Sequence, residues 1–352
     1  MVQQRALVGM SGGVDSSVAA WLTLQQGYAC AGGTMRLHSF SCGGADDASD
    51  AQAVARKLGI PHYILDCQEE FAQQVISNFV SVYESGGTPN PCIQCNRHLK
   101  FGAMLDWALS HGFDYVVSGH YARIRRDPVS QRYLLYKAAD QAKDQTYFLA
   151  CLNQRQLSHI LFPLGDLTKT EVRQIAEENG FVNARKRDSQ DICFVPGGDY
   201  AAFLRQYTGK DYPPGAYLDL NGNVVGQHQG AVCYTKGQRK GLGIALGAPV
   251  YVCGKDMQNN TVTVGPNEAL FSPALRAADW NWLPFPELSQ PLRVTAKTRH
   301  SQCEQPATVY PEADGTARVE FDTPQRAVTP GQAVVLYQND LVIGGGTITE
   351  AL

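Results

Sequence analysis

Short apolar runs alternate with longer amphipathic segments through the first half of the chain. The runs at 6–9, 29–36, 62–65 and 115–118 have the length and apolar content of buried strands. Apolar positions at helical spacing predict helices at 14–26, 48–58, 69–83 and 101–111. This alternation predicts an α/β fold with a doubly wound parallel sheet, in which ligands lie at the carboxyl ends of the strands. A further helix is bounded by a capping box, Thr168-x-x-Glu171, and by Gly180.

The pattern changes near Pro196, beyond which short β-prone runs are separated by Gly, Pro, Asn and Asp. These runs lie at 224–226, 248–252, 261–264, 293–298, 316–321, 333–337 and 341–349. Segments 219–223 and 314–315 carry hairpin signals, and the three glycines at 344–346 predict a turn or a bulge. We therefore expect one domain at 1–195 and two small β-rich domains at 196–272 and 273–352.

The composition is that of a globular intracellular protein. No run of about 18 apolar residues occurs, so we expect no membrane span and no membrane partner. The first five residues run directly into the first predicted strand, which predicts no leader peptide and a cytoplasmic location. Ten cysteines in such a chain do not indicate a disulfide framework. We expect most of them, including Cys30, Cys233 and Cys253, to be small buried side chains.

The formal net charge of −3 argues against indiscriminate binding of nucleic acid. Basic residues nevertheless gather locally. For any one group, plain solvated charge is the simpler interpretation, but together they favour a shaped RNA surface. The groups lie at 123–126, 185–187, 236–240 and 297–300.

Residues 11–17, SGGVDSS, form a glycine turn between the first predicted strand and the first predicted helix. Such a turn presents backbone N–H groups and the positive end of a helix to an anion. Because no lysine follows the glycines, this is not the P-loop that grips a γ-phosphate. An ordinary strand–helix turn is the simpler alternative. The segment resembles the loop of the ATP pyrophosphatases, which split ATP between its α and β phosphates.

Two segments carry candidate nucleophilic thiols. In 88–97, TPNPCIQCNR, two prolines precede Cys92 and Cys95, which we expect on a loop ahead of a helix. A thiol near a helix N-terminus, with Arg97 nearby, should have a lowered pKa. The pair could be half of a zinc site, a redox pair or neither, and no second Cys-x-x-Cys supports structural zinc. From burial preferences alone, Cys193 between Ile192 and Phe194 would be core packing.

Eight segments in order along the chain together resemble the tRNA-specific 2-thiouridylase (MnmA/TrmU) family. They are SGGVDSS (11–17), TPNPCIQCNR (88–97), SGHYAR (118–123), KDQTYFL (143–149), PLGDLTKTEVR (163–173), DSQDICF (188–194), YTKGQRKGLG (234–243) and TPQRAVTPGQA (323–333). The resemblance spans nearly the whole chain. It implies an ATP pyrophosphatase domain, a central β-rich domain and a C-terminal β-barrel that contacts tRNA.

The resemblance also implies roles for individual residues. Cys95 would be the catalytic nucleophile, and Cys193 would carry sulfur as a persulfide. The residues implied to bind ATP are Gly9, Met10, Ser11, Gly12, Gly13, Val14, Asp15, Ser16, Met35 and Gly119. Asn90, Pro91 and Cys92 would face the target base, and Lys143, Asp144, Gln145, Arg299 and His300 would contact tRNA. His120 and Gln332 match positions tied to tRNA specificity.

The implied reaction replaces O2 of the wobble uridine of Lys, Glu and Gln tRNAs by sulfur, and it consumes ATP. Mg²⁺ should bridge the phosphates, with Asp15 as a candidate partner of the metal, and a cysteine desulfurase or a relay protein should supply the sulfur. One position departs from the family, since Cys92 stands where an aspartate with an acid/base role is usual. The three thiols could instead hold an iron–sulfur cluster. Another ATP pyrophosphatase-type synthetase and a zinc-stabilised RNA-binding module are the remaining alternatives.

Overall fold

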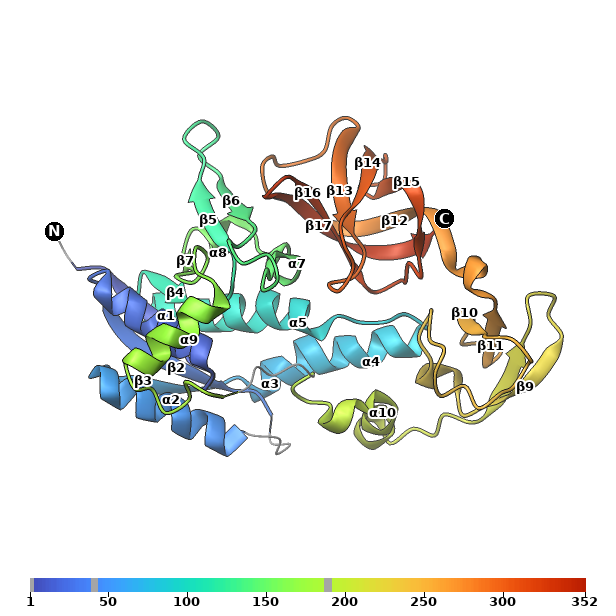
Figure 1. The fold of residues 1–352 in the computed structure, drawn as a ribbon, viewed down its shortest axis with the longest axis horizontal. Helices are drawn as coiled ribbons and strands as arrows, with labels where there is room; N and C mark the ends of the chain where they lie inside the picture. Colours follow the sequence, from blue (N-terminus) through green and yellow to red (C-terminus); the bar gives the residue numbers. More distant parts are fainter. Residues whose placement is uncertain (1–2, 39–43, 187–191) are drawn as a thin grey trace.

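The structure is a computed structural model that describes residues 3–38, 44–186 and 192–352. Residues 187–191, which include the first four positions of the DSQDICF motif, lie outside the described residues, as do the first two residues of the chain. Figure 1 shows a parallel sheet with its helices at one end of the molecule. A barrel and a smaller sheet lie at the other end, and α4 and α5 run between the parts.

A parallel sheet forms the core of the N-terminal part, as the sequence predicts. Its strand order is β3-β2-β1-β4-β7 in the described part of the chain, and every neighbouring pair is parallel. The strands are β1 (Arg5–Gly9), β2 (Ala29–Arg36), β3 (His62–Asp66), β4 (Tyr115–Val117) and β7 (Ile160–Leu161). The predicted strands at 6–9, 29–36, 62–65 and 115–118 are thus confirmed to within a residue at their ends, and only β7 was missed.

Helices cover both faces of this sheet, so the doubly wound arrangement is confirmed. Ala6 and Val8 of β1 pack toward α1 (Val14–Gln25), α2 (Gly44–Leu58) and α9 (Lys169–Glu178). Leu7 between them packs with the helical segments of the opposite face. Those segments are α3 (Gln68–Phe71), η1 (Ala72–Ile76), α4 (Ser77–Glu84), α5 (Pro91–Gln94), η2 (Cys95–Ala103) and α6 (Met104–Ser110). Short helices α7 (Thr146–Leu149) and α8 (Gln154–Leu157) follow β4 in the chain.

The capping box is confirmed at the start of α9. The Thr168 hydroxyl accepts from the Glu171 N–H at 3.3 Å, and the Glu171 carboxylate accepts from the Thr168 N–H at 2.7 Å. Gly180 follows the end of the helix with φ 59°. In contrast, the expected helices at 69–83 and 101–111 contain π-helical stretches, η1 and η2. Apolar spacing alone does not distinguish an i→i+5 from an i→i+4 hydrogen-bond pattern.

A small sheet of order β10-β11-β8-β9 follows the parallel-sheet part. Its strands are β8 (Gly215–Leu218), β9 (Val224–His228), β10 (Tyr251–Asp256) and β11 (Thr261–Gly265). The predicted turn at 219–223 joins β8 to β9, as expected. The helix α10 (Tyr200–Thr208) was not predicted, and short helical turns η3 (Pro196–Gly198), η4 (Ala231–Cys233) and η5 (Asn267–Leu270) punctuate the chain. Cys30 is buried as predicted, whereas Cys233 and Cys253 are half-buried.

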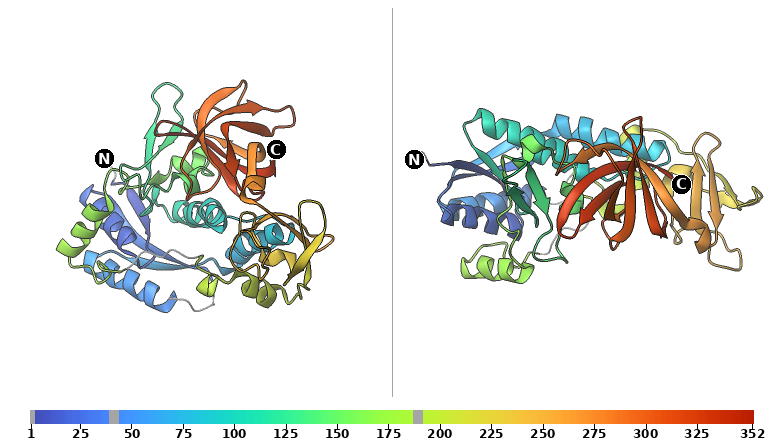
Figure 2. Two further views of the ribbon diagram at one scale, coloured as in Figure 1. Left: turned by 45° about the vertical axis from the view of Figure 1, so that its right-hand side comes forward. Right: turned by 90° about the horizontal axis from the view of Figure 1, so that it is seen from above.

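The C-terminal strands close into a barrel, because β12 pairs with both β15 and β17. The strands are β12 (Phe271–Trp282), β13 (Leu292–Lys297), β14 (Gln305–Pro311), β15 (Ala317–Arg326), β16 (Ala333–Gln338) and β17 (Leu341–Ala351). The hairpin β5 (Arg123–Arg126) and β6 (Tyr133–Tyr136), from the N-terminal part, adds to β17 through the pair Leu341 and Tyr136. Figure 2 shows this hairpin beside the barrel in both further views. The division at 195 and 272 stays a prediction.

The glycines at 344–346 are not a turn, but the alternative of a bulge is confirmed: the pairing of β17 with β12 shifts register between Ala278, opposite Thr347, and Asn281, opposite Gly345. They lie inside β17 and pair regularly with Leu336, Val335 and Val334 of β16. A Cβ on Gly346 would lie 2.8 Å from the Trp280 ring, and one on Gly344 would lie 2.9 Å from the Trp282 ring. These glycines therefore let two indole rings pack onto the strand.

Candidate active site

The glycine loop after β1 lies at the switch point of the parallel sheet. The chain passes from β1 to β2 on one side while β4 lies on the other, so a crevice opens at the carboxyl ends of β1 and β4. Gly119 follows β4, and a Cβ there would lie 2.7 Å from the backbone carbon of Asp15 and 2.8 Å from the nitrogen of Ser16. The structure thus brings Gly119 against the loop, at a distance that only glycine permits.

Hydroxyl groups hold the loop in shape. Gly12 has φ 73°, and the Ser16 hydroxyl accepts from the Ser11 N–H at 3.3 Å and donates to the Gly13 carbonyl at 3.0 Å. Among the described residues, no side chain caps α1, so the first-turn amides, beginning at Val14, stay open. Open amides at a helix N-terminus suit a phosphate. These residues therefore fit the nucleotide that the resemblance implies.

Asn183 is a loop residue that sequence reasoning missed. Its side-chain amide donates to the Gly12 carbonyl and to the Ser17 hydroxyl, both at 2.9 Å. Asn183 is 3% exposed, and within the described residues its Oδ1 has no hydrogen-bond partner. A buried amide that clamps the glycine turn from behind leaves no pattern in sequence by which it could be found.

Asp15 is held by a charge pair. The Lys169 ammonium, at the first position of α9, donates to both Asp15 carboxylate oxygens at 2.7 Å. The Tyr121 hydroxyl donates to the same carboxylate at 2.9 Å. The Asp15 carboxylate is thus already bonded to Lys169 and Tyr121, and the pair holds the lysine ammonium beside the nucleotide loop. Lys169 lies in the family-like segment PLGDLTKTEVR, in which the sequence pattern identifies only the helix cap at Thr168 and Glu171.

Met10 and Met35 lie at the same edge of the sheet as the loop. Gly9 pairs with Gly33 in β2, and Met35 is two residues further along that strand. The Thr34 hydroxyl donates to the Met10 carbonyl at 2.7 Å, which fixes the chain where it leaves β1. The residues implied to bind ATP therefore gather at one edge of the parallel sheet.

A metal site of protein side chains is not formed by the residues that the structure describes. No three His, Cys, Asp or Glu side chains in that part of the chain are grouped closely enough to hold a metal ion. Cys92, Cys95 and Cys193, as placed, do not make a ligand set for a cluster. Asp15 is engaged by Lys169, so phosphate oxygens would be the main ligands of a magnesium ion here.

Cys92 and Cys95 lie within helical turns, which corrects the expected loop. Pro91 opens α5, as proline favours the first helical position, and Cys95 begins the π-helical η2. Cys92 is exposed, whereas Cys95 is 8% exposed. Cys95 and the residues around it pack into the core cluster on this face of the sheet.

The π-helical winding of η2 brings Lys100 toward the thiols. In an α-helix, residues five apart point about 140° away from each other. A π-helix turns less per residue than an α-helix, so residues five apart lie closer to one side, and the charge of Lys100 acts on Cys92 and Cys95. The Gln156 amide donates to the Arg97 and Phe101 carbonyls of this segment at 2.9 and 2.8 Å. Sequence reasoning missed Lys100 because the π-helix was not predicted.

The predicted lowering of the thiol pKa values is wrong. Desolvation by the surrounding protein raises the pKa of the buried Cys95 and also that of Cys92, although Cys92 as a residue is exposed, and the positive charge of Lys100 offsets only part of this rise. Arg97 does not act on these thiols; instead, its charge lowers the pKa of Cys151 against the larger effect of burial. Desolvation of the thiolate therefore outweighs the helix N-terminus.

Cys193 comes to the same centre from the segment between α9 and α10, and its neighbour Phe194 belongs to the same core cluster as Cys95. Its neighbour Phe194 is 1% exposed and packs edge-on against Phe71, Phe79 and Phe203, with ring centroids 5.1 to 5.5 Å apart. Cys193 itself is exposed, so the core-packing alternative does not hold. Although the residue is exposed, the protein around its thiol desolvates the thiolate and raises the pKa of Cys193 to about 11, and the charges of Cys95 and Cys92 add to the rise. The three thiols therefore share one electrostatic environment.

The residues implied to contact tRNA fall into two kinds. Lys143 is partly exposed at the protein surface. Asp144 and Gln145 instead hold the local chain: the Asp144 carboxylate accepts from the Thr146 hydroxyl at 2.6 Å, and the Gln145 side chain accepts from the Tyr121 N–H at 2.9 Å. Burial raises the pKa of Asp144.

His120 is 7% exposed and lies below the surface. Its Nδ1 is 2.6 Å from the Ser118 hydroxyl, and its ring packs near Phe101 and Phe162. Burial, with a smaller effect of the Lys100 charge, lowers the pKa of His120 well below its usual value. A neutral buried imidazole is suited to a structural contact or to stacking against a nucleobase that enters the site.

Arg299, His300 and Gln332 lie where the barrel meets the other parts. The Arg299 guanidinium donates to the Lys236 carbonyl at 3.1 Å and to the Thr329 hydroxyl at 2.8 Å. The His300 ring lies 4.5 Å from that of Phe148. Gln332 contacts the segment ahead of Asn90. Of the three, Gln332 contacts the thiol segment directly.

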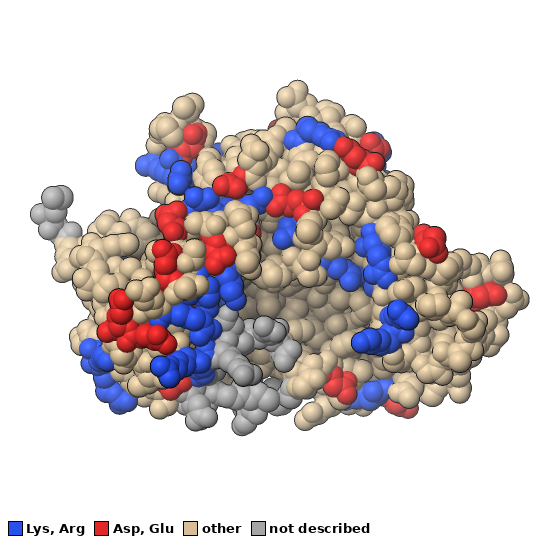
Figure 3. All heavy atoms as spheres, in the orientation of Figure 1, with Lys and Arg blue, Asp and Glu red and all other residues tan. Residues whose placement is uncertain are grey.

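Basic side chains line a hollow between the parts. Figure 3 shows Lys and Arg residues on both sides of this hollow, which the parallel-sheet part and the two β-rich parts enclose. An acidic chain with a locally basic hollow can bind a polyanion of complementary shape. No helix of the described residues is long and apolar enough to span a bilayer.

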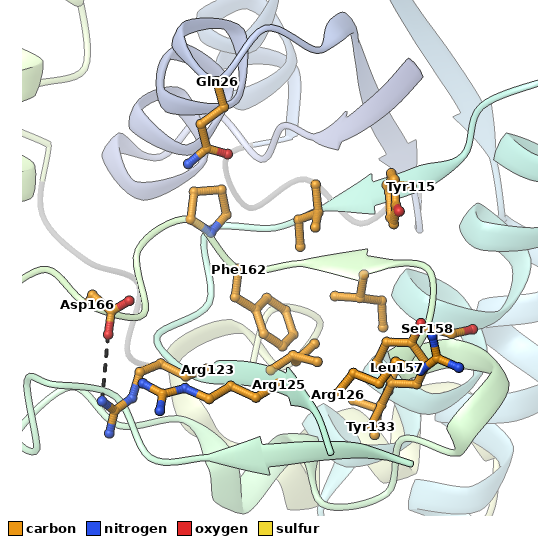
Figure 4. A pocket seen from close by; sticks show the side chains of 14 residues that line it. Gln26, Tyr115, Arg123, Arg125, Arg126, Tyr133, Leu157, Ser158, Phe162 and Asp166 are labelled. Atoms are coloured by element: carbon orange, nitrogen blue, oxygen red, sulfur yellow. Dashed lines mark ion pairs between the residues drawn. The ribbon is translucent and has the colours of Figure 1, made fainter. Parts of the chain in front are cut away.

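A second basic feature is a cavity of about 340 Å³ between β5 and β7. In the described part of the chain these are edge strands of their sheets. Figure 4 shows Arg123, Arg125 and Arg126 along one wall, with Arg123 paired to Asp166 at 3.6 Å. Phe162 contributes to an apolar floor. We name this cavity the arginine pocket.

The fold and site define a nucleotide-binding α/β protein with a thiol centre beside its nucleotide loop. Three family models match, described as a tRNA methyl transferase HUP domain (residues 4–197), a tRNA methyl transferase PRC-barrel domain (201–266) and an aminomethyltransferase beta-barrel domain (272–348). The chain belongs to the tRNA-specific 2-thiouridylase MnmA family.

Curated relatives of that name align over essentially the whole chain. The relative from Acetivibrio thermocellus is 50% identical, covering 99% of this chain and 100% of the relative. That from Symbiobacterium thermophilum is 49% identical, covering 100% and 93%. That from Clostridioides difficile is 45% identical, covering 100% and 99%.

Proposed function

We propose that this protein is a tRNA 2-thiouridylase, which replaces the C2 oxygen of the wobble uridine by sulfur at the expense of ATP. One observation carries the proposal: Cys95 and Cys193, almost a hundred residues apart, are close enough for their charges to interact. Although two of the matching models are described as methyl transferases, a centre of thiols suits sulfur transfer. The full-length relatives support the same assignment.

The first step makes the uridine oxygen able to leave. The C2 oxygen attacks the α-phosphorus of ATP, pyrophosphate departs, and the base carries AMP on that oxygen. The open amides of the loop at 11–17 and the N-terminus of α1 would hold the phosphates. Mg²⁺, bound mainly through phosphate oxygens, would supply charge neutralisation. Lys169 stands beside the loop and would add a second positive charge.

The second step transfers sulfur. The terminal sulfur of a Cys193 persulfide forms a bond to C2, and the C2–O bond breaks with release of AMP. The Cys95 thiolate then attacks the inner sulfur of the persulfide, which leaves sulfur on C2 and joins Cys95 to Cys193 as a disulfide. A thiol reductant must restore both cysteines. Each step has a good leaving group, which direct displacement of the oxygen lacks.

The partners follow from this chemistry. A cysteine desulfurase, directly or through a relay protein, would load Cys193, whose exposed position supports such an approach. The target base would leave the anticodon stack to reach Cys95, beside Asn90, Pro91 and Cys92. Lys, Glu and Gln tRNAs are the expected substrates, and the cytoplasm is the expected location.

Transfer of radiolabelled sulfur to wobble-uridine tRNA tests the proposal. Cys193→Ser and Cys95→Ser should each lower incorporation at least about 100-fold, because each removes a covalent step. Cys193→Ser should keep ATP-dependent release of pyrophosphate. Cys303→Ser, which removes an exposed thiol of the C-terminal part, is the matched control and should leave incorporation unchanged. Full incorporation by Cys193→Ser would refute the persulfide route and would require a different sulfur carrier, whereas no incorporation by the unmodified protein would favour another ATP pyrophosphatase reaction.

A further inference from the structure

A turn of the barrel lies against the segment that precedes the catalytic helix. The Thr88 N–H donates to the Pro330 carbonyl at 2.9 Å. The side-chain amide of Gln332 donates to the Thr88 carbonyl and to the Pro89 carbonyl, both at 3.0 Å. Two parts of the chain more than 240 residues apart are thus joined just ahead of Cys92 and Cys95. We name these contacts the barrel clamp.

Glycines bring the two backbones of the barrel clamp into direct contact. Gly331 has φ 87°, and a Cβ there would lie 2.5 Å from a methyl group of Val82 and 3.0 Å from the Thr88 carbonyl oxygen. A Cβ on Gly87 would lie 2.8 Å from the Pro330 carbonyl oxygen. The approach is therefore a backbone-to-backbone fit with no room for a side chain.

Gln332 itself is fixed within the barrel. Its N–H donates to the Thr329 carbonyl at 3.3 Å, and its carbonyl accepts from the Ile348 N–H of β17 at 2.8 Å. The next residue, Ala333, accepts from the Tyr147 hydroxyl at 2.9 Å. A side chain that extends from so fixed a backbone can set the position of a less regular segment.

The amide of Gln332 has its donors occupied. Its nitrogen carries two hydrogens, and both are directed at carbonyls of the thiol segment. Pro89 and Pro91 flank Asn90 and carry no N–H, so few backbone bonds are available to hold this stretch. The two carbonyl contacts from Gln332 therefore supply a restraint that the segment cannot make for itself.

We propose that Gln332 is a positioning residue, which holds the segment carrying Cys92 and Cys95 in place from the barrel. This assigns Gln332 to alignment of the nucleophile and not to direct selection of tRNA, and it rests on the proposed function. Cys95 lies six residues after Pro89, on the helix that follows the clamped stretch. A shift of about 1 Å in the reacting sulfur lowers a rate by up to about 100-fold.

The first test is the reactivity of Cys95 in the protein without RNA or ATP. Gln332→Met keeps the size of the side chain and removes both donors. We expect iodoacetamide to modify Cys95 several-fold faster, because the restraint that keeps it buried is lost, while Cys193 keeps its rate. Gln338→Met is the matched control, since the Gln338 amide donates to Arg293 within the barrel at 2.8 Å. Peptide mass spectrometry separates the thiols.

The second test is catalysis. Under single-turnover conditions with saturating tRNA, we expect Gln332→Met to thiolate about tenfold more slowly, with its Kd for tRNA within about twofold of wild type. Gln332→Lys, which restores a donor at this place, should recover most of the rate. Gln332→Glu keeps the shape of the side chain but removes its hydrogen-bond donors, so it should thiolate as slowly as Gln332→Met. It replaces Gln332→Met in the test if that variant does not fold.

Two results would overturn the proposal. Unchanged Cys95 reactivity in both donor-less variants would show that the clamp does not position the segment. A weakened Kd with the full rate at saturation would assign Gln332 to tRNA contact. Because the alkylation test needs neither tRNA nor ATP, it judges the clamp even if the protein proves not to thiolate tRNA.

Discussion

Replacing Lys169 by methionine tests the charge pair beneath the nucleotide loop. The ammonium donates to both oxygens of Asp15 at 2.7 Å, and the two side chains are 11% and 30% exposed. Removing one partner of a fully buried pair costs about 3–5 kcal/mol. Because Asp15 is partly solvated and keeps the Tyr121 hydroxyl at 2.9 Å, we expect a loss of about 2 kcal/mol in the free energy of unfolding.

The assay is amide hydrogen exchange of α1 peptides in rising urea, which reports this helix and not the barrel. A double-mutant cycle with Asp15→Asn isolates the pair from other contacts of Lys169, and its coupling should be about 1–2 kcal/mol. Lys186→Met is the control, since its pair with Asp50 is more exposed and should contribute less than about 1 kcal/mol. A Lys169–Asp15 coupling below about 0.5 kcal/mol would refute the reasoning.

Three further outcomes are expected. Lys100→Met removes the positive charge that lowers the pKa of the site thiols. The thiolation rate should therefore fall several-fold at pH 8, and the part of the pH–rate profile that reports thiol ionisation should move to higher pH. The control Lys240→Met should change neither the rate nor the profile. Gly119→Ala puts a Cβ 2.7 Å from the Asp15 backbone, so ATP affinity by calorimetry should drop at least about tenfold, and an unchanged Kd would contradict the close contact. The double variant Arg125→Ala/Arg126→Ala should weaken tRNA binding and reduce the slope of log K against log salt by about 1–2, whereas an unchanged slope would exclude the arginine pocket from the RNA surface.

The elements of the parallel sheet could be predicted because the residues that determine each element lie within that element or next to it in the sequence. The strand at 6–9 begins with three consecutive apolar residues and ends at the glycine turn, and α9 carries its own caps. The glycine loop was found for the same reason, since its chemistry lies in seven consecutive residues. Elements with strong local signals were therefore recovered, whereas α10 and the hairpin of β5 and β6, which carry weaker ones, were missed.

What sequence could not provide depends on contacts between distant segments. The pKa of Cys95 follows from its burial under other elements, so a rule based on its own helix gave the wrong direction. The charge of Lys100 acts on the thiols across the π-helical η2, a winding that apolar spacing does not predict. Lys169 is an unremarkable first-turn lysine until the fold brings Asp15 beside it.

The pairing of β17 with β6 bears on how this protein can be divided. The last strand of the chain continues a sheet into a hairpin that the chain forms before its midpoint. A chain truncated at residue 272 would leave β6 with an open hydrogen-bonding edge and would remove the Ala333 carbonyl that accepts from the hydroxyl of Tyr147, which is 1% exposed in the intact chain. Such a fragment should aggregate or pair with a second copy through that edge. The barrel is thus not a detachable module, and gene truncations should inactivate the protein through loss of solubility before any chemistry is tested.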